Sequence, residues 1–191
     1  MKSAYLVLDM QNDLVHPDGP NGQSPLGLEA ARRQVVPSTA RAIAAARRAG
    51  VAVGFVRVGF SDDYRECPAA SPLFTVVREY GILKLSSWGG SLHPDLPVEP
   101  GDLQVVKHRV SPFFATPLEM LLRTAGVGHV YCSGVSTQAV VQACVRDAHD
   151  RDFRVTGLED CCSAASQEEH DASLSALSMF ASIARSDAIG A

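Results

Sequence analysis

The chain has 191 residues, of which 46% are hydrophobic and 20% are charged, a composition typical of one globular domain with a single core. Its formal net charge of -4 and the lack of a dense Lys/Arg stripe argue against a nucleic-acid partner. No apolar run of about 18 residues and no secretory signal is visible, so we expect no membrane partner and a cytoplasmic location.

The cysteines and the basic residues give no sign of a special site. The five cysteines are odd in number and lack CxxC spacing, which argues against a disulfide framework and a zinc site. The most basic cluster lies on a predicted helix and is interpreted as a solvated face; it comprises Arg32, Arg33, Arg41, Arg47 and Arg48. We predict no metal and no cofactor.

Short apolar runs recur along the chain and suit strands that are buried on both faces. They predict strands at residues 4–8, 51–58, 103–106, 127–132 and 153–158.

Segments of helical composition and loops separate these runs. Helices are predicted at residues 28–49, ended by Gly50; at 117–124, capped by Thr116; from Ser136 or Thr137 to Asp150; and from a capping box of Ser166 and Glu169 to about Met179. Residues 12–27 are predicted to be a loop, and residues 59–100 a long irregular connection of a kind that is usually functional or partner-facing.

Because strands and helices alternate, the sequence predicts an α/β fold in one domain, residues 1–191, with a parallel sheet covered by helices on both faces. In such sheets the site lies outside the carboxyl ends of the strands. The polar strand ends are therefore the candidates for function, and these are Asp9, Lys107 and the turn at Gly134.

Asp9 follows a buried apolar run, and Lys107 ends another. A partly desolvated carboxylate has a raised pKa and can move protons, although a loop-capping aspartate is the alternative. A lysine at a strand end can hold Asp9 ionised or stabilise negative charge on a substrate, and the alternative is an ordinary lysine at the sheet edge.

The turn at Gly134 opens a predicted helix, and backbone N–H groups at a helix N-terminus bind anions and developing oxyanions. A cysteine in that first turn would have a lowered pKa and be a good nucleophile. In the stretch GVSTQAVVQAC, however, the expected position holds Val140, which has no reactive atom.

Three separated pieces of the chain, "LVLDMQND", "VVKHRVSPFF" and "GVSTQAVVQACVRDAHD", resemble the isochorismatase-like superfamily, also called the cysteine hydrolases. The resemblance covers nearly the whole chain and extends to "SSWGGSLHPDL" and "LEDCCSAASQEEH". It implies a Rossmann-like fold with a six-stranded parallel sheet, whose short sixth strand lies near residues 180–183. It also implies a homo-oligomer, a dimer or a tetramer, and often a cis peptide bond at the position of Val135–Ser136.

The resemblance also implies catalytic residues. Asp9 and Lys107 match two members of the Asp–Lys–Cys triad of the amidohydrolase branch, but the third motif, roughly G-V-x-T-x-x-C-V, places Val140 where the cysteine stands. Metal-binding relatives use an Asp with nearby histidines, whereas the corresponding stretch "GFSDDYRECP" has no histidine. By position, the predicted substrate-binding residues are Gln11, Trp88, Phe113, Val135, Ser136, Thr137 and Val140.

Three functions remain open from the sequence. The first is a hydrolase of a small polar metabolite that uses Asp9 acid/base chemistry with Lys107, on a vinyl ether or a related C–O or C–N bond. The second is a catalytically altered or inactive member that binds a small molecule or partners another enzyme. The third is a cysteine amidohydrolase with a relocated thiol, supplied by Cys144, Cys161 or Cys162.

Overall fold

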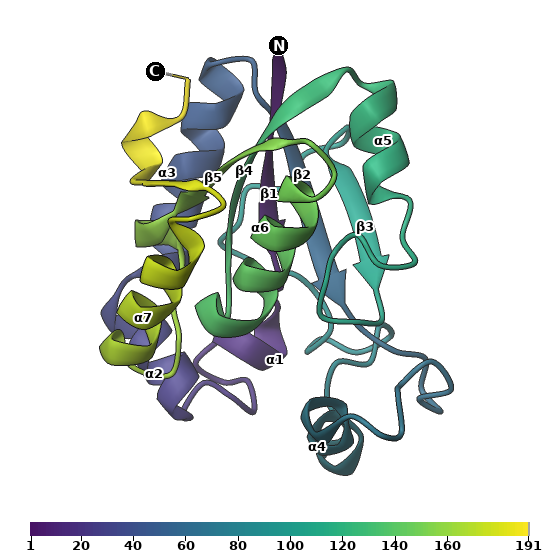
Figure 1. The fold of residues 1–191 in the computed structure, drawn as a ribbon. Helices are drawn as coiled ribbons and strands as arrows, with labels where there is room; N and C mark the ends of the chain where they lie inside the picture. The colour runs from purple at the N-terminus through teal and green to yellow at the C-terminus, as the bar shows by residue number, and fades with distance from the viewer. Residues whose placement is uncertain (191) are drawn as a thin grey trace.

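Six strands form one sheet, and every neighbouring pair is parallel (Figure 1). The computed structural model describes residues 1–190, and the sheet order is β3-β2-β1-β4-β5-β6. The strands are β1 (Lys2–Leu8), β2 (Ala52–Val58), β3 (Leu103–Lys107), β4 (Val127–Gly134), β5 (Arg154–Leu158) and β6 (Ser182–Ala184). The predicted α/β class and parallel sheet are confirmed, and the sixth strand begins two residues later than expected.

Strand β1 lies at the centre of the sheet, between β2 and β4. Residues 4–8 are all 0% exposed, which is why this strand reads as a continuous apolar run rather than an alternating one. Successive side chains point to opposite faces, so Leu6 and Leu8 belong to one core cluster and Tyr5 and Val7 to the other.

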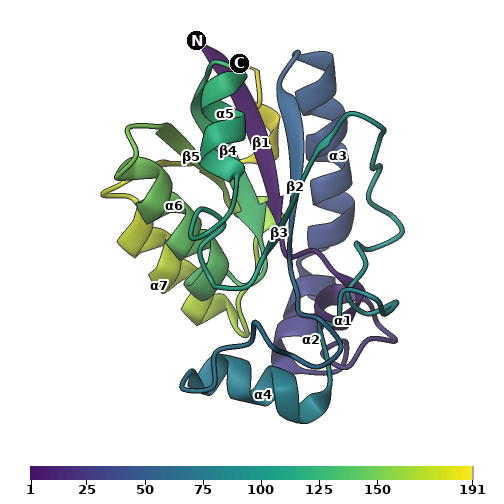
Figure 2. The same cartoon turned by 90° about the vertical axis from the view of Figure 1, so that its right-hand side faces the viewer.

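Helices cover both faces of the sheet, as predicted (Figure 2). The face that includes Leu6 and Leu8 is covered by α5 (Leu118–Thr124), α6 (Gln142–His149) and α7 (Gln167–Leu177). The opposite face is covered by α1 (Asn12–Val15), α2 (Pro25–Arg32) and α3 (Val35–Arg48). No helix within residues 1–190 is long and apolar enough to span a bilayer.

The predicted helix at residues 28–49 is wrong, because two helices, α2 and α3, occupy this region. The break falls at Gln34, whose φ of 53° places it in the left-handed region. The Arg33 side chain turns inward there and donates hydrogen bonds to the carbonyl oxygens of Cys162 and Glu159. Helix α2 also begins at Pro25, and α1 lies at Asn12–Val15, so residues 12–27 are not one loop.

The sequence also predicts an irregular connection at residues 59–100, but this segment contains α4 (Pro72–Tyr80). The Ser71 hydroxyl accepts a hydrogen bond from Phe74 N, Pro72 occupies the first turn, and Gly81 ends the helix with a φ of 66°. Helix α4 lies apart from the helices that cover the sheet, beyond the carboxyl ends of the strands (Figures 1 and 2). The segment therefore has a structure of its own next to the predicted site.

The predicted N-termini of α7, α5 and α6 agree with the structure to different degrees. Ser166 caps α7 by accepting a hydrogen bond from Glu169 N, as expected. Thr116 accepts one from Leu118 N, but the helix begins at Leu118 rather than at Pro117. Neither Ser136 nor Thr137 caps through its side chain. The chain instead forms a π-helical turn, Thr137–Val141, before α6.

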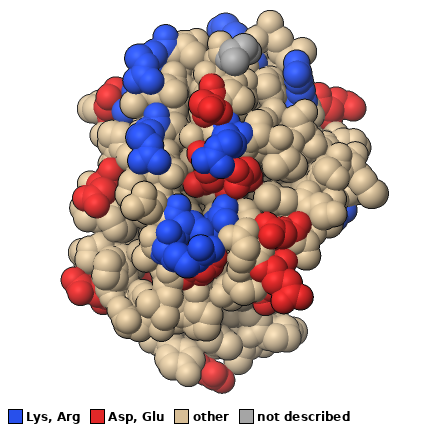
Figure 3. Space-filling model, turned by 90° about the vertical axis from the view of Figure 1, so that its left-hand side faces the viewer, with Lys and Arg blue, Asp and Glu red and all other residues tan. Residues whose placement is uncertain are grey.

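Basic and acidic side chains share the surface over α2 and α3 (Figure 3). Arg32 pairs with Glu29 at 2.6 Å, and Arg47 pairs with Asp102 at 2.7 Å. Arg33 likewise pairs with Glu159 at 3.3 Å, so acidic groups are interspersed among the basic ones on this surface.

Candidate active site

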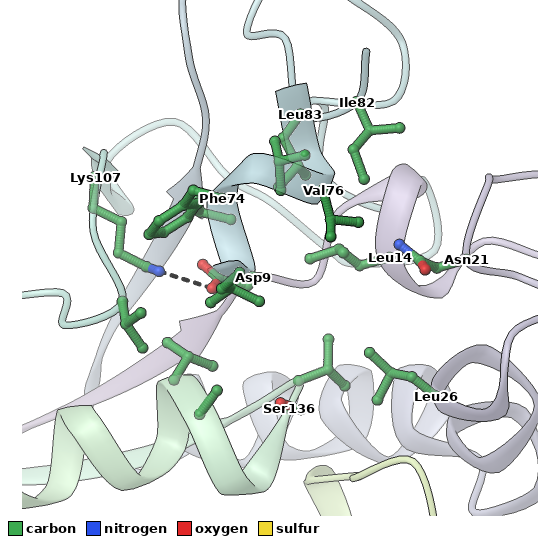
Figure 4. Close-up of a pocket in the computed structure, with 17 residues that line it drawn as sticks. Asp9, Leu14, Asn21, Leu26, Phe74, Val76, Ile82, Leu83, Lys107 and Ser136 are labelled. Atoms are coloured by element: carbon green, nitrogen blue, oxygen red, sulfur yellow. Dashed lines mark hydrogen bonds and ion pairs between the residues drawn. The ribbon is translucent and has the colours of Figure 1, made fainter. Parts of the chain in front are cut away.

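A cavity of about 290 Å³ lies at the carboxyl ends of β1, β2 and β3, where α4 and the π-helical turn close over it (Figure 4). Four of its 17 lining residues are polar: Asp9, Asn21, Lys107 and Ser136. The others are Leu14, Leu26, Val58, Leu73, Phe74, Val76, Val77, Ile82, Leu83, Val110, Val135, Ala139 and Val140. The site is therefore a mostly apolar pocket with a few polar groups, the usual form of a small-molecule site.

Asp9 is the residue directly after β1, and its backbone takes the left-handed conformation with a φ of 57°. Its amide donates to Val56 O, so the chain turns while it is still tied to β2. The residue is 5% exposed; its Oδ2 accepts from Lys107, and its buried Oδ1 has no hydrogen-bond partner among the described residues. Burial raises the pKa of Asp9 above its ordinary value, although the Lys107 ammonium opposes the shift.

Lys107 is the last residue of β3, and its side chain is 1% exposed. Its ammonium donates to Asp9 Oδ2 at 2.8 Å and to the Arg109 carbonyl at 3.1 Å. A buried ammonium is stable only when it is paired and hydrogen-bonded, and these two acceptors meet that need. The Lys107 ammonium is thus hydrogen-bonded to the Asp9 carboxyl group and to a main-chain carbonyl oxygen.

The turn after β4 brings a third group of residues to the pocket. A Cβ atom at Gly134 would lie 2.2 Å from the Leu8 carbonyl oxygen, so only glycine allows β4 to approach β1 this closely. The Val135–Ser136 peptide bond is cis. The Ser136 carbonyl accepts from Val141 N, five residues on, which makes the turn wider than an α-helical one. Val135, Ser136 and Val140 all line the pocket.

None of the five cysteines lines this pocket, and all are buried. A hydrogen bond with Cys144, together with burial, raises the pKa of Cys132 well above its ordinary value. Burial likewise raises the pKa of both Cys161 and Cys162. High pKa values and inaccessibility make thiols inert, so the arrangement gives no support to a relocated cysteine nucleophile.

Two residues predicted to bind substrate lie outside the pocket. The Gln11 side chain is 0% exposed because its amide bonds to Val58 N, Val58 O and Gly90 O. It fastens the end of β1 to β2 rather than facing a ligand. Trp88 is 53% exposed and packs edge-on against the His16 ring at 4.9 Å, so it forms no wall of this cavity.

Two further predicted residues are buried behind the pocket. Phe113 belongs to the core on the α5–α6 face and stacks on Phe153, with ring centroids 6.1 Å apart. Thr137 is 0% exposed, and its hydroxyl bonds to His170 Nδ1 at 2.9 Å. Arg33 can only donate to His170 Nε2, so the ring proton is on Nδ1, which donates a hydrogen bond to the Thr137 hydroxyl oxygen.

Sequence reasoning missed the residues that form most of the apolar wall. Leu73, Phe74, Val76 and Val77 come from α4, and Ile82 and Leu83 follow it directly. The cap signals at Ser71 and Gly81 mark this helix in the sequence. No local signal shows that α4 folds back over the ends of β1 and β3. The composition of residues 12–27 predicts a plain loop and gives no indication that Asn21, Leu14 and Leu26 line the pocket.

Within residues 1–190 no group of three or more His, Cys, Asp or Glu side chains is gathered closely enough to hold a metal ion.

The chain resembles known proteins over nearly its whole length. Residues 3–188 match the family described as the isochorismatase domain. The ureidoacrylate amidohydrolase RutB of Enterobacter sp. (strain 638) is 32% identical over 178 residues, which cover 87% of this chain and 77% of RutB.

Solved structures show the same fold. An isochorismatase family protein from Desulfovibrio vulgaris subsp. vulgaris str. Hildenborough superposes with a TM-score of 0.86 at 25% identity, over 98% of this chain and 96% of that one. N-carbamoylsarcosine amidase from Thermoplasma acidophilum superposes with a TM-score of 0.79 at 27% identity, over 100% of both chains. The predicted resemblance is confirmed.

Proposed function

This chain belongs to the isochorismatase family of hydrolases, and we propose that it cleaves its substrate without a thiol, through proton transfer by Asp9 with Lys107 as its partner. We take Val140 to stand at the position that a nucleophilic cysteine occupies in the amidohydrolase branch. The proposal rests on the match of Gly134, Val135 and Thr137 to that branch's motif.

The observation that carries the proposal is the environment of Asp9. Its buried Oδ1 lies beside an apolar cavity and has no hydrogen-bond partner within residues 1–190, and burial raises the pKa of Asp9. A carboxyl group of this kind holds a proton at a higher pH than a solvated one and can give it to a substrate. Lys107 lies against the other oxygen at 2.8 Å and keeps the carboxyl group in one orientation.

Hydrolysis of a vinyl ether fits these groups. The Asp9 proton adds to the distal carbon of the double bond, forming a C–H bond and leaving an oxocarbenium ion beside the Asp9 carboxylate. Water bonds to the cationic carbon and returns a proton to Asp9. The resulting hemiketal breaks its C–O bond and yields a ketone and an alcohol. No covalent enzyme intermediate is required, so a valine at position 140 is compatible with this chemistry.

A second function is favoured by a different observation. Val140 supplies no reactive atom, and 13 of the 17 lining residues are apolar, as they would be in a pocket that binds a ligand and releases it unchanged. In this alternative the chain is a binding protein of the family and Asp9 with Lys107 only orients the ligand.

One panel separates the two functions. Amides, ureides and vinyl ethers are incubated with the protein and with its Asp9→Asn, Cys144→Ala, Cys161→Ala and Cys162→Ala variants, and the products are measured by mass spectrometry. We expect turnover of a vinyl ether by the protein and by the three cysteine variants. Asp9→Asn should lower it by about 100-fold or more, because it cannot donate the proton. Asparagine keeps the shape and tolerates the left-handed backbone at this position.

Loss of activity in any cysteine variant that still folds would overturn the proposal. Binding of a panel compound without turnover would favour the second function.

A further inference from the structure

The two charged side chains that line the pocket form an ion pair with each other. Asp9 and Lys107 are the only ionisable residues among its 17 lining residues, and they bind each other at 2.8 Å. The Lys107 ammonium has a second acceptor in the Arg109 carbonyl, and its side chain is 1% exposed. No free cation is therefore left among the lining residues to neutralise an acidic ligand.

The rest of the lining is hydrocarbon on several sides. Leu14 and Leu26 come from α1 and α2, and Phe74 and Val76 come from α4. A ligand that enters loses its water and gains van der Waals contact with these groups. A carboxylate or phosphate would lose its hydration there without gaining a counter-ion, and that cost opposes binding.

A single neutral polar side chain lies at the end of the pocket away from Asp9. Asn21 is on the loop between α1 and α2, and Figure 4 shows it beside Leu14 and Leu26, across the pocket from Lys107. Its main-chain groups bond to Asp13 and Ser24, whereas no hydrogen bond of its side-chain amide is found within residues 1–190. The amide is half-buried and can both donate to and accept from a ligand.

We infer that the pocket selects an uncharged ligand with a hydrocarbon body, whose reactive polar group meets Asp9 and whose far end carries a hydroxyl or carbonyl that binds Asn21. This inference rests on the proposed function, because it names the substrate class of the same site. It also changes the expected substrate from a small polar metabolite to a mainly apolar one. The volume of about 290 Å³ is near the lower limit of ligand pockets, so the ligand is small.

Matched probes test the charge preference. Binding of 3-phenylpropanamide and of 3-phenylpropanoate, which have the same shape, is measured by calorimetry at neutral pH. We expect the amide to bind at least about tenfold more tightly than the carboxylate, because only the carboxylate must lose charge hydration. The Leu26→Arg variant adds a cation to the wall and should reverse this order. Leu28→Arg is the control, because Leu28 lies on the same helix, is 53% exposed and does not line the pocket.

A second pair of probes tests Asn21. In the unmodified protein, 3-(4-hydroxyphenyl)propanamide should bind about tenfold more tightly than 3-phenylpropanamide, because its hydroxyl reaches the far end. In Asn21→Ala this advantage should vanish, and the two probes should bind equally tightly. A uniform loss for both probes would mean that Asn21 only shapes the loop, and it would overturn this part of the inference.

Equal or tighter binding of the carboxylate to the unmodified protein, or no binding of the amide, would overturn the inference. These outcomes are distinct from failure of the proposed function. Amide binding without turnover of any panel compound would remove the proposed catalysis and keep the ligand class. Asp9-dependent turnover of an anionic compound would keep the catalysis and remove the ligand class.

Discussion

The ammonium of Lys107, at the end of β3, donates a 2.8 Å hydrogen bond to the carboxylate of Asp9, directly after β1, although β2 lies between the two strands. Asp9 is 5% exposed and Lys107 is 1% exposed, so neither charge is solvated. The Lys107 ammonium offsets part, but not all, of the desolvation that raises the pKa of Asp9. The pair therefore links three strand ends at the mouth of the pocket.

Removing Lys107 should destabilise the protein strongly. In Lys107→Met the buried Asp9 loses the ammonium that offsets its desolvation and must take up a proton to stay buried, and we expect a loss of about 3–5 kcal/mol in the free energy of unfolding at neutral pH. Urea denaturation of the variant and the unmodified protein measures the difference.

The double variant Asp9→Asn/Lys107→Met is the control, because it removes both charges and keeps similar shapes. It should recover most of the loss. A single variant within about 0.5 kcal/mol of the unmodified protein would show that the pair does not need both members.

The raised pKa of Asp9 gives a stability profile with a definite sign. The folded state binds the Asp9 proton more tightly than the unfolded state, whose pKa is near the ordinary 3.8. The contribution of Asp9 to stability is therefore fully present below pH 3.8 and is lost as the pH rises through the folded-state pKa. As the pH rises through this range, the free energy of unfolding of the unmodified protein should fall relative to that of Asp9→Asn. The fall should be about 1.4 kcal/mol for each unit by which folding raises the pKa of Asp9.

Parallel urea titrations of the two proteins from about pH 4 to pH 8 check this difference. Turnover that needs protonated Asp9 should fall over the same pH range. A stability difference that grows as the pH rises would mean that Lys107 outweighs burial and that the pKa of Asp9 is lowered.

A thiol placed at position 140 should be reactive. Val140 lines the pocket, and the neighbouring Val141 is buried in the core without lining it. Iodoacetamide should therefore label Val140→Cys at least about tenfold faster than Val141→Cys, while the native cysteines stay unlabelled in the folded protein. Mass spectrometry of the labelled peptides measures both rates. Equal rates would show that position 140 has no access to the pocket.

The sequence predicts the sheet because its strands are short and mostly apolar. Residues 4–8 and 127–132 have no alternating pattern, and this indicates burial on both faces before any contact is known. Parallel strands with buried faces then place Asp9, Lys107 and the Gly134 turn at one edge. These three positions meet in the structure because the topology requires it.

The pocket wall could not be predicted in the same way. The position of α4 depends on contacts such as that of Phe60 with Phe74, residues 14 apart in sequence, whose rings meet at 5.5 Å. Gln11 is polar and lies two residues after Asp9, so its sequence position favours a ligand contact. In the structure its side-chain amide instead forms hydrogen bonds with the backbone of Val58. Hydrogen-bond partners distant in sequence decide such cases, and local patterns do not record them.

Phe74 and Trp88 lie in the same connection, but we expect their substitution to have different effects on stability and ligand binding. Phe74 is 5% exposed, lines the pocket and packs on Phe60, whereas Trp88 is 53% exposed and outside the pocket. Phe74→Ala should cost about 3–5 kcal/mol of stability and weaken binding of 3-phenylpropanamide, because it opens a cavity in the wall. Trp88→Ala should change stability by about 0.5 kcal/mol or less and leave binding unchanged.

A third variant separates binding from folding. Leu73 also lines the pocket but is 53% exposed, so Leu73→Ala should weaken probe binding while costing far less stability than Phe74→Ala. Urea denaturation and calorimetry on all three variants measure the two effects independently. If Trp88→Ala weakened binding as much as Leu73→Ala, the ligand would extend beyond the cavity to the outer loop, and α4 would not be the wall that determines which ligand fits.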